Sequence, residues 1–129
     1  MSLADQYFCV SNMSTGFSYD KNLRRWESVD FNISENKYII SKSSEGIYEV
    51  TEAGGKNSIC HCASDFNGFG YLNCDCVLGK FKFNKLNGRF IMSYIGGYFN
   101  VLPEINQITD ESSDTPQITI GVCSPFEIE

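Results

Sequence analysis

The feature that most constrains this chain is a series of short segments in which apolar and polar side chains alternate, separated by clusters of Gly, Asn, Asp and Ser. A period of two places alternate side chains on opposite faces of a β-strand. No window of about 11 or more residues carries the i, i+3, i+4, i+7 apolar spacing of an amphipathic helix. The pattern therefore predicts an all-β chain.

The alternating segments predict about eight or nine strands joined by short turns. The predicted strands cover residues 7–12, 15–19, 37–42, 46–51, 58–64, 70–78, 80–84, 89–96 and 117–123. The clearest hairpin turns at Asn87-Gly88, because this dipeptide readily adopts positive φ. Consecutive hairpins of this kind favour a small antiparallel β-barrel, lipocalin-like and up-and-down, with a β-sandwich as the alternative.

Aromatic residues make up 14% of the chain, and they suit a pleated, half-buried surface. We expect a group of them to fill the interior of the barrel. This group is Trp26, Phe31, Phe81, Phe83, Phe90 and Tyr94.

The length of 129 residues predicts one β domain, over residues 4–129. Residues 1–3 resemble an expression-vector leader, and Ala4-Asp5-Gln6 suits the start of a mature chain after removal of a signal peptide. A net charge of −6 disfavours nucleic acid and anionic lipid surfaces as partners. No apolar run approaches the roughly 18 residues of a membrane span.

One acidic, proline-bounded segment, residues 103–116, contains no alternating pattern and predicts a mobile loop. Its carboxylates Asp110, Glu111 and Asp114 lack the spacing and the glycine of a calcium-binding loop. They therefore indicate a solvated loop rather than a metal site.

Six cysteines carry most of the chemistry in this sequence. Cys9 lies in the first predicted strand and Cys123 in the last, and a closed barrel makes those strands neighbours. A bond between them closes a loop of more than a hundred residues, which contributes about 4–5 kcal/mol in the chain-entropy model.

The other four cysteines form two short motifs, Cys60-His61-Cys62 and Cys74-Asp75-Cys76. If their strands pair antiparallel about Gly68, Cys60 faces Cys76 and Cys62 faces Cys74, within reach of disulfide bonds. The alternatives are free buried thiols or a zinc site made of four thiolates. The spacing disfavours zinc, because its cysteine ligands normally lie two to four residues apart on a turning backbone.

His61 is the single histidine of the chain. Between two cysteines it could act as a metal ligand or lower the pKa of a thiol. Strand alternation instead places it on the face opposite Cys60 and Cys62, as a half-exposed side chain. The sequence contains no nucleophile elbow, phosphate loop or zinc-protease motif, so it predicts no catalytic residue, metal or cofactor.

The order of several short motifs resembles a family of small uncharacterised proteobacterial proteins, a domain of unknown function usually made with a signal peptide. The resemblance is carried by Cys9, Gly16-Phe17-Ser18-Tyr19, Trp26, Phe31, Gly70-Tyr71-Leu72-Asn73-Cys74, Phe81-Lys82-Phe83-Asn84, Gly88-Arg89-Phe90, Tyr94, Gly97-Tyr98 and Ile120-Gly121-Val122-Cys123-Ser124-Pro125. It implies a periplasmic or secreted protein and no particular activity. Family members have about four cysteines rather than six, so the resemblance leaves the bonding of Cys60, Cys62, Cys74 and Cys76 open.

The sequence favours a non-enzymatic exported module that binds a small apolar ligand or a protein partner through an aromatic barrel mouth or an exposed strand edge. Two other functions stay open. One is a redox or metal-binding protein that uses Cys60, Cys62, Cys74 and Cys76, and the other is a structural or inhibitory accessory protein. The sequence does not identify ligand-binding residues.

Overall fold

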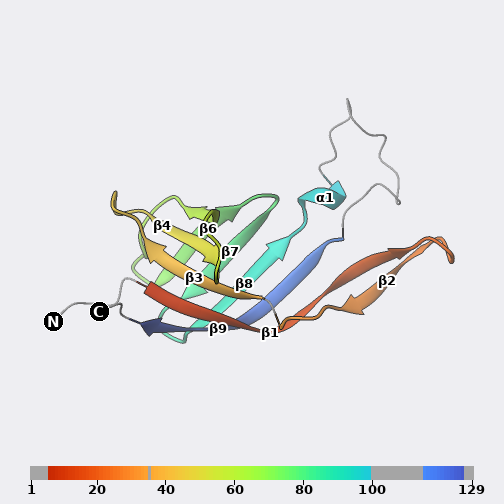
Figure 1. Ribbon diagram of the computed structural model, residues 1–129, viewed down its shortest axis with the longest axis horizontal. Coiled ribbons are helices and arrows are strands. Elements are labelled where there is room, and N and C mark those ends of the chain that lie inside the picture. Colours follow the sequence, from red (N-terminus) through yellow and green to blue (C-terminus); the bar gives the residue numbers. More distant parts are fainter. Residues whose placement is uncertain (1–5, 35, 100–114, 127–129) are drawn as a thin grey trace, which may run out of the picture.

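The computed structural model describes residues 6–34, 36–99 and 115–126. This part of the chain forms nine strands and one single-turn helix (Figure 1). The elements are β1 (Gln6–Asp20), β2 (Arg25–Asp30), β3 (Lys37–Lys42), β4 (Tyr48–Glu52), β5 (Ser58–Cys62), β6 (Tyr71–Cys76), β7 (Gly79–Asn84), β8 (Arg89–Tyr94), α1 (Gly96–Phe99) and β9 (Gln117–Phe126).

The strands form one antiparallel sheet that closes on itself. Each strand from β3 to β8 pairs with the next along the chain, β1 pairs with β3, and β9 returns to pair with β1. Every strand except β2 thus belongs to a closed barrel of eight strands. The structure confirms the predicted up-and-down antiparallel barrel rather than the sandwich.

The first two predicted strands are one strand in the structure. β1 runs without interruption from Gln6 to Asp20, and its register against β9 shifts between Ser11 and Met13. This bulge allows Ser11 and Ser14 both to be buried, although they are three positions apart and strict alternation would place them on opposite faces. Without the bulge, the side chains after it would point to the opposite side of the sheet. The bulge therefore keeps the same face of this long strand toward the barrel interior.

The second half of β1 leaves the barrel together with β2. Thr15 to Asp20 pair with Arg25 to Asp30, and Figure 1 shows this two-stranded ribbon projecting beyond the barrel. Among the described residues, β2 pairs with β1 only, so its other edge is open. The ribbon explains why one interior prediction is wrong. Trp26 lies on β2 and is partly exposed, because β2 is outside the closed ring.

The barrel interior is filled by alternate side chains of the ring strands. Phe81, Phe83 and Phe90 are buried there as predicted, and the rings of Phe81 and Phe90 stack with centroids 5.2 Å apart. Phe31 and Tyr94, also expected inside, are only partly buried. The remaining buried apolar residues are Cys9, Tyr38, Ile40, Tyr48, Val50, Cys60, Cys62, Leu72, Cys74 and Cys123.

The hairpin between β7 and β8 turns at the predicted dipeptide. Gly88 has a φ of 76°, a conformation that favours glycine, and its N–H donates to the carbonyl of Asn84 at 2.8 Å. This turn places Arg89 at the start of β8, opposite Val122 of β9.

Candidate functional site

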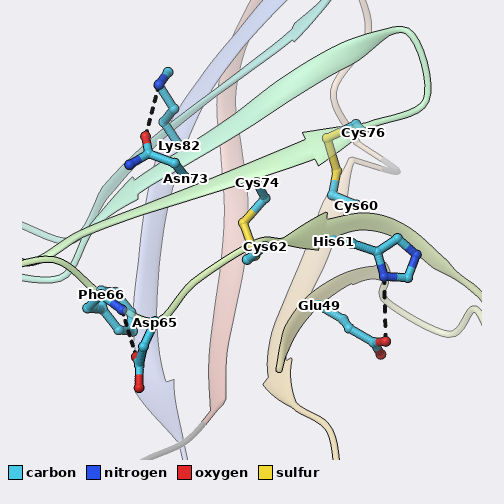
Figure 2. Close-up of a disulfide and its surroundings, with 10 residues drawn as sticks. All are labelled: Glu49, Cys60, His61, Cys62, Asp65, Phe66, Asn73, Cys74, Cys76 and Lys82. Carbon is cyan, nitrogen blue, oxygen red and sulfur yellow. Dashed lines mark hydrogen bonds and ion pairs between the residues drawn. A yellow bond between two sulfur atoms is a disulfide. The ribbon is translucent and has the colours of Figure 1, made fainter. Parts of the chain in front are cut away.

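All six cysteines are bonded in pairs, and each pair joins neighbouring strands. The bonds are Cys9–Cys123 between β1 and β9, and Cys60–Cys76 and Cys62–Cys74 between β5 and β6 (Figure 2). In each pair the two residues are direct partners in the strand register. These are the bonds predicted from antiparallel pairing, and they leave no cysteine free.

The bonded sulfurs do not form a metal-binding or catalytic site. Cys60, Cys62 and Cys74 are each at most 2% exposed and point into the barrel interior. Thiolates are the form of cysteine that binds metal or attacks a substrate, and disulfide sulfurs cannot supply them. The described residues also contain no group of three or more His, Cys, Asp or Glu side chains that could hold a metal ion. The structure thus gives no support to the redox or metal-binding alternative.

His61 lies between two bonded cysteines but faces away from them, as alternation predicted. Figure 2 shows its ring turned to the outer side of β5, toward Glu49 of β4. The Nδ1 atom lies 3.6 Å from a carboxylate oxygen of Glu49, and the side chain is 66% exposed. An exposed pair of this kind contributes little to stability and does not activate a neighbouring group.

The main unusual feature of the surface is an apolar face on the outside of the barrel, which we name the apolar wall. Its strands are adjacent, since Val10 pairs with Val122 and Ile120 lies between Met13 and Ile91. Each member is between 37% and 61% exposed. The members are Phe8, Val10, Met13 and Phe17 of β1, Ile91 of β8, Ile95 after it, and Ile118, Ile120 and Val122 of β9.

The opposite side of the barrel is polar. The outer side chains of β3 to β7 include Ser41, Glu49, Thr51, His61, Asn73, Asp75, Lys80 and Lys82. On this side the Asp75 carboxylate pairs with Lys80, which lowers the pKa of Asp75 through the hydrogen bond and the charge. Other large apolar side chains are exposed at Tyr71 of β6 and in turns, at Ile47, Phe69, Val77, Leu78 and Leu86, whereas the wall gathers nine of them on neighbouring strands.

At one end of the wall lies a groove that we name the aromatic groove. It has a volume of about 580 Å³ and is lined by Phe17, Trp26, Ile95, Tyr98 and Pro116. The Trp26 ring packs edge-on against Tyr98 of α1, with centroids 5.2 Å apart, so the groove lies between the ribbon and the end of β8. A smaller adjoining groove of about 250 Å³ continues it to Ile118.

At the other end lies a second groove, which we name the Tyr71–Arg89 groove. Its volume is about 630 Å³. Outer side chains of β6, β7 and β8 form its polar part, and wall residues form much of the rest. It is lined by Asn12, Tyr71, Asn73, Lys82, Phe83, Asn84, Arg89, Phe90, Ile91, Ile120, Gly121 and Val122. Sequence reasoning identified no binding residue here, although Lys82 and Asn84 alternate with buried Phe81 and Phe83.

Comparison with family models finds no match, and no curated protein or solved structure is significantly similar. The resemblance to a proteobacterial family thus stays a prediction. Three disulfides indicate an oxidising environment of the extracellular type. In the described ranges, no helix has the length and apolarity needed to cross a membrane.

Several predictions concern parts of the chain outside the described residues. These are the leader at residues 1–3, most of the acidic segment 103–116, and the carboxylates Asp110, Glu111 and Asp114. They stay predictions.

Proposed function

We propose that this protein is a non-enzymatic binding module, exported to the periplasm or secreted, that docks a protein partner on its apolar wall. The observation that carries this proposal is the wall itself. Soluble monomeric proteins rarely expose apolar patches larger than a few hundred Å², and larger patches mark interaction sites.

The size of the wall fits an interface with a protein. A large apolar side chain has on the order of 200 Å² of surface, so nine of them at these exposures present on the order of 800 Å². A standard protein interface buries about 800 Å² on each partner. Partner binding would therefore cover most of the apolar surface that the wall leaves in water.

The wall is also preorganised, which lowers the entropic cost of binding. β1 and β9 pair over ten positions, and the Cys9–Cys123 bond joins them on the inner side of the same seam. Val10 and Val122 lie next to these cysteines and point outward, so the bond holds the middle of the wall in place.

Photo-crosslinking in the source organism tests this proposal. Benzoylphenylalanine is placed at Ile120, in the centre of the wall, or at Lys80 on the polar side as a matched control. The expected result is a discrete cross-linked protein at Ile120 that is absent at Lys80. Cross-links at neither position, or the same products at both, would contradict the proposal.

A second candidate is binding of a small apolar ligand in the aromatic groove. It is favoured by five apolar lining residues and by a volume within the usual range for ligand sites, about 300–1,000 Å³. The barrel interior is a weaker choice, because the Phe81, Ile40, Leu72 and Val50 side chains fill it without exposure to solvent. A fluorescent apolar probe that binds with equal affinity to wild type and to a Phe17→Ser, Tyr98→Ser variant would count against this groove.

A further inference from the structure

We propose that the Tyr71–Arg89 groove is a separate binding site for an acidic oligosaccharide. A sugar ring would lie on Tyr71, and a carboxylate or sulfate group would pair with Arg89. Three lining residues, Ile91, Ile120 and Val122, also belong to the apolar wall, but Tyr71 and Arg89, which would hold the sugar, do not.

The charge of the groove selects an anion. Its two charged lining residues, Lys82 and Arg89, are both cations, although the whole chain carries a net charge of −6. No described residue forms an ion pair with Arg89. Asp75, a carboxylate on the outer face of β6, is paired with Lys80 instead. An unpaired guanidinium at a groove is suited to bind a planar anion through two hydrogen bonds.

The amides of the groove leave donors free for a ligand. The side-chain Oδ1 of Asn73 accepts a hydrogen bond from the Lys82 ammonium at 2.9 Å, as Figure 2 shows. The side-chain Oδ1 of Asn84 likewise accepts from the backbone N–H of Leu86 at 2.9 Å. With both oxygens engaged, the two NH₂ groups remain as donors. Such donors match the hydroxyl and carboxylate oxygens of a sugar acid.

An aromatic platform lies at the rim of the groove. Tyr71 is 45% exposed, and it stacks on Phe69, which is 70% exposed, with ring centroids 5.8 Å apart and an interplanar angle of 28°. The C–H face of a pyranose ring packs on an aromatic ring of this kind. The platform and the free donors together distinguish a sugar acid from a simple inorganic anion.

Two other ligand classes fit the groove less well. A purely apolar ligand would cover Arg89 and Lys82 without pairing them, and desolvation of an unpaired charge is costly. A nucleic acid could stack on Tyr71, but its repeated phosphates require a longer basic track and are repelled by the net charge of −6.

Isothermal titration with defined oligosaccharides tests the site in the full-length protein. The probes are trigalacturonate, which carries carboxylates, a heparin-derived tetrasaccharide, which carries sulfates, and maltotriose, which is neutral. We expect binding of at least one acidic probe, weakened by added salt, and no binding of maltotriose. The acidic probe that binds more tightly identifies the anion.

Variants then assign the residues. Arg89→Ala and Tyr71→Ala are each expected to weaken binding about tenfold or more, and Arg89→Lys to restore only part of the loss. Lys80→Ala, on the same outer surface but outside the groove, should change affinity less than about twofold. Circular dichroism confirms that each variant is folded.

Three results would overturn the proposal: no binding of either acidic probe, equal binding of maltotriose, or an equal effect of Lys80→Ala and Arg89→Ala. Tighter binding of oligo(dT) than of both sugars would instead assign the groove to nucleic acid. The Arg89 and Tyr71 variants leave every residue of the apolar wall unchanged, so loss of sugar binding in them would not decide whether a protein partner cross-links to the wall.

Discussion

Replacement of Cys9 and Cys123 together by alanine should destabilise the barrel more than removal of either other disulfide. This bond spans a sequence separation of 114 residues, and in the chain-entropy model such a bond contributes about 4.8 kcal/mol at 25 °C. The Cys62–Cys74 bond spans 12 residues and contributes about 2.8 kcal/mol in the same model. Removing it alone costs less still, because Cys60–Cys76 continues to close the same hairpin.

The Cys62→Ala, Cys74→Ala variant is the matched control. Both bonds are buried, with all four cysteines at most 6% exposed, so each variant removes two buried sulfur atoms. The difference between the two variants therefore isolates loop closure, and it should be about 2 kcal/mol or more.

Urea unfolding followed by circular dichroism measures this difference. Trp26, the single tryptophan, is unsuitable as the main probe because it lies on the projecting ribbon and not in the barrel. Equal losses of unfolding free energy in the two variants would refute the reasoning. That result would mean that the unfolded chain already holds its ends close together or that the bond acts through the native state.

Three further predictions follow from the packing. Gly121→Ala should lower the free energy of unfolding by about 3 kcal/mol, because a Cβ there would overlap a β1 carbonyl oxygen and the Phe90 ring. Gly68→Ala is the control: a Cβ there meets nothing within 4 Å, so thermal unfolding of this variant should match wild type. Thr119→Val should cost about 1–3 kcal/mol in urea unfolding, because it leaves the buried hydroxyl of Ser14 without its 2.9 Å hydrogen bond; no loss would show that this bond is dispensable. Burial, and to a smaller extent the Glu52 carboxylate, raises the pKa of Tyr38 above its usual value of about 10, so spectrophotometric titration should find at least one tyrosine that ionises late. Stability should fall as the pH rises above 10, because the unfolded tyrosine ionises there before the folded one. Ionisation of all tyrosines near pH 10 in the folded protein would contradict this last prediction.

Much of the barrel follows from local sequence. The segment 37–42 matches β3 at both ends, and the Asn87-Gly88 turn lies where its dipeptide places it. The two cysteine pairs between β5 and β6 also follow from the local sequence, because residues spaced by two on antiparallel strands face each other at fixed positions. Side-chain alternation and turn chemistry are sufficient to determine these features.

The outer site could not be predicted in the same way. Ile118, Ile120 and Val122 alternate with Thr119, Gly121 and Cys123, and the larger apolar set is the natural choice for the core. The structure has the opposite arrangement, with Thr119 and Cys123 buried and the three large side chains exposed. A Cβ at Gly121 would overlap the Phe90 ring, so the interior beside β9 has room only for small residues.

The sequence by itself thus determined which residues alternate, where the Asn87-Gly88 hairpin turns and, once β5 and β6 pair antiparallel, which of their cysteines face each other. Closure of the barrel decided which face of β9 lies inside, because rings from β7 and β8 and the Cys9–Cys123 bond already occupy the space there. The apolar wall and the two grooves at its ends are consequences of that closure. They depend on strands far apart in the chain, and only the tertiary structure brings those strands together.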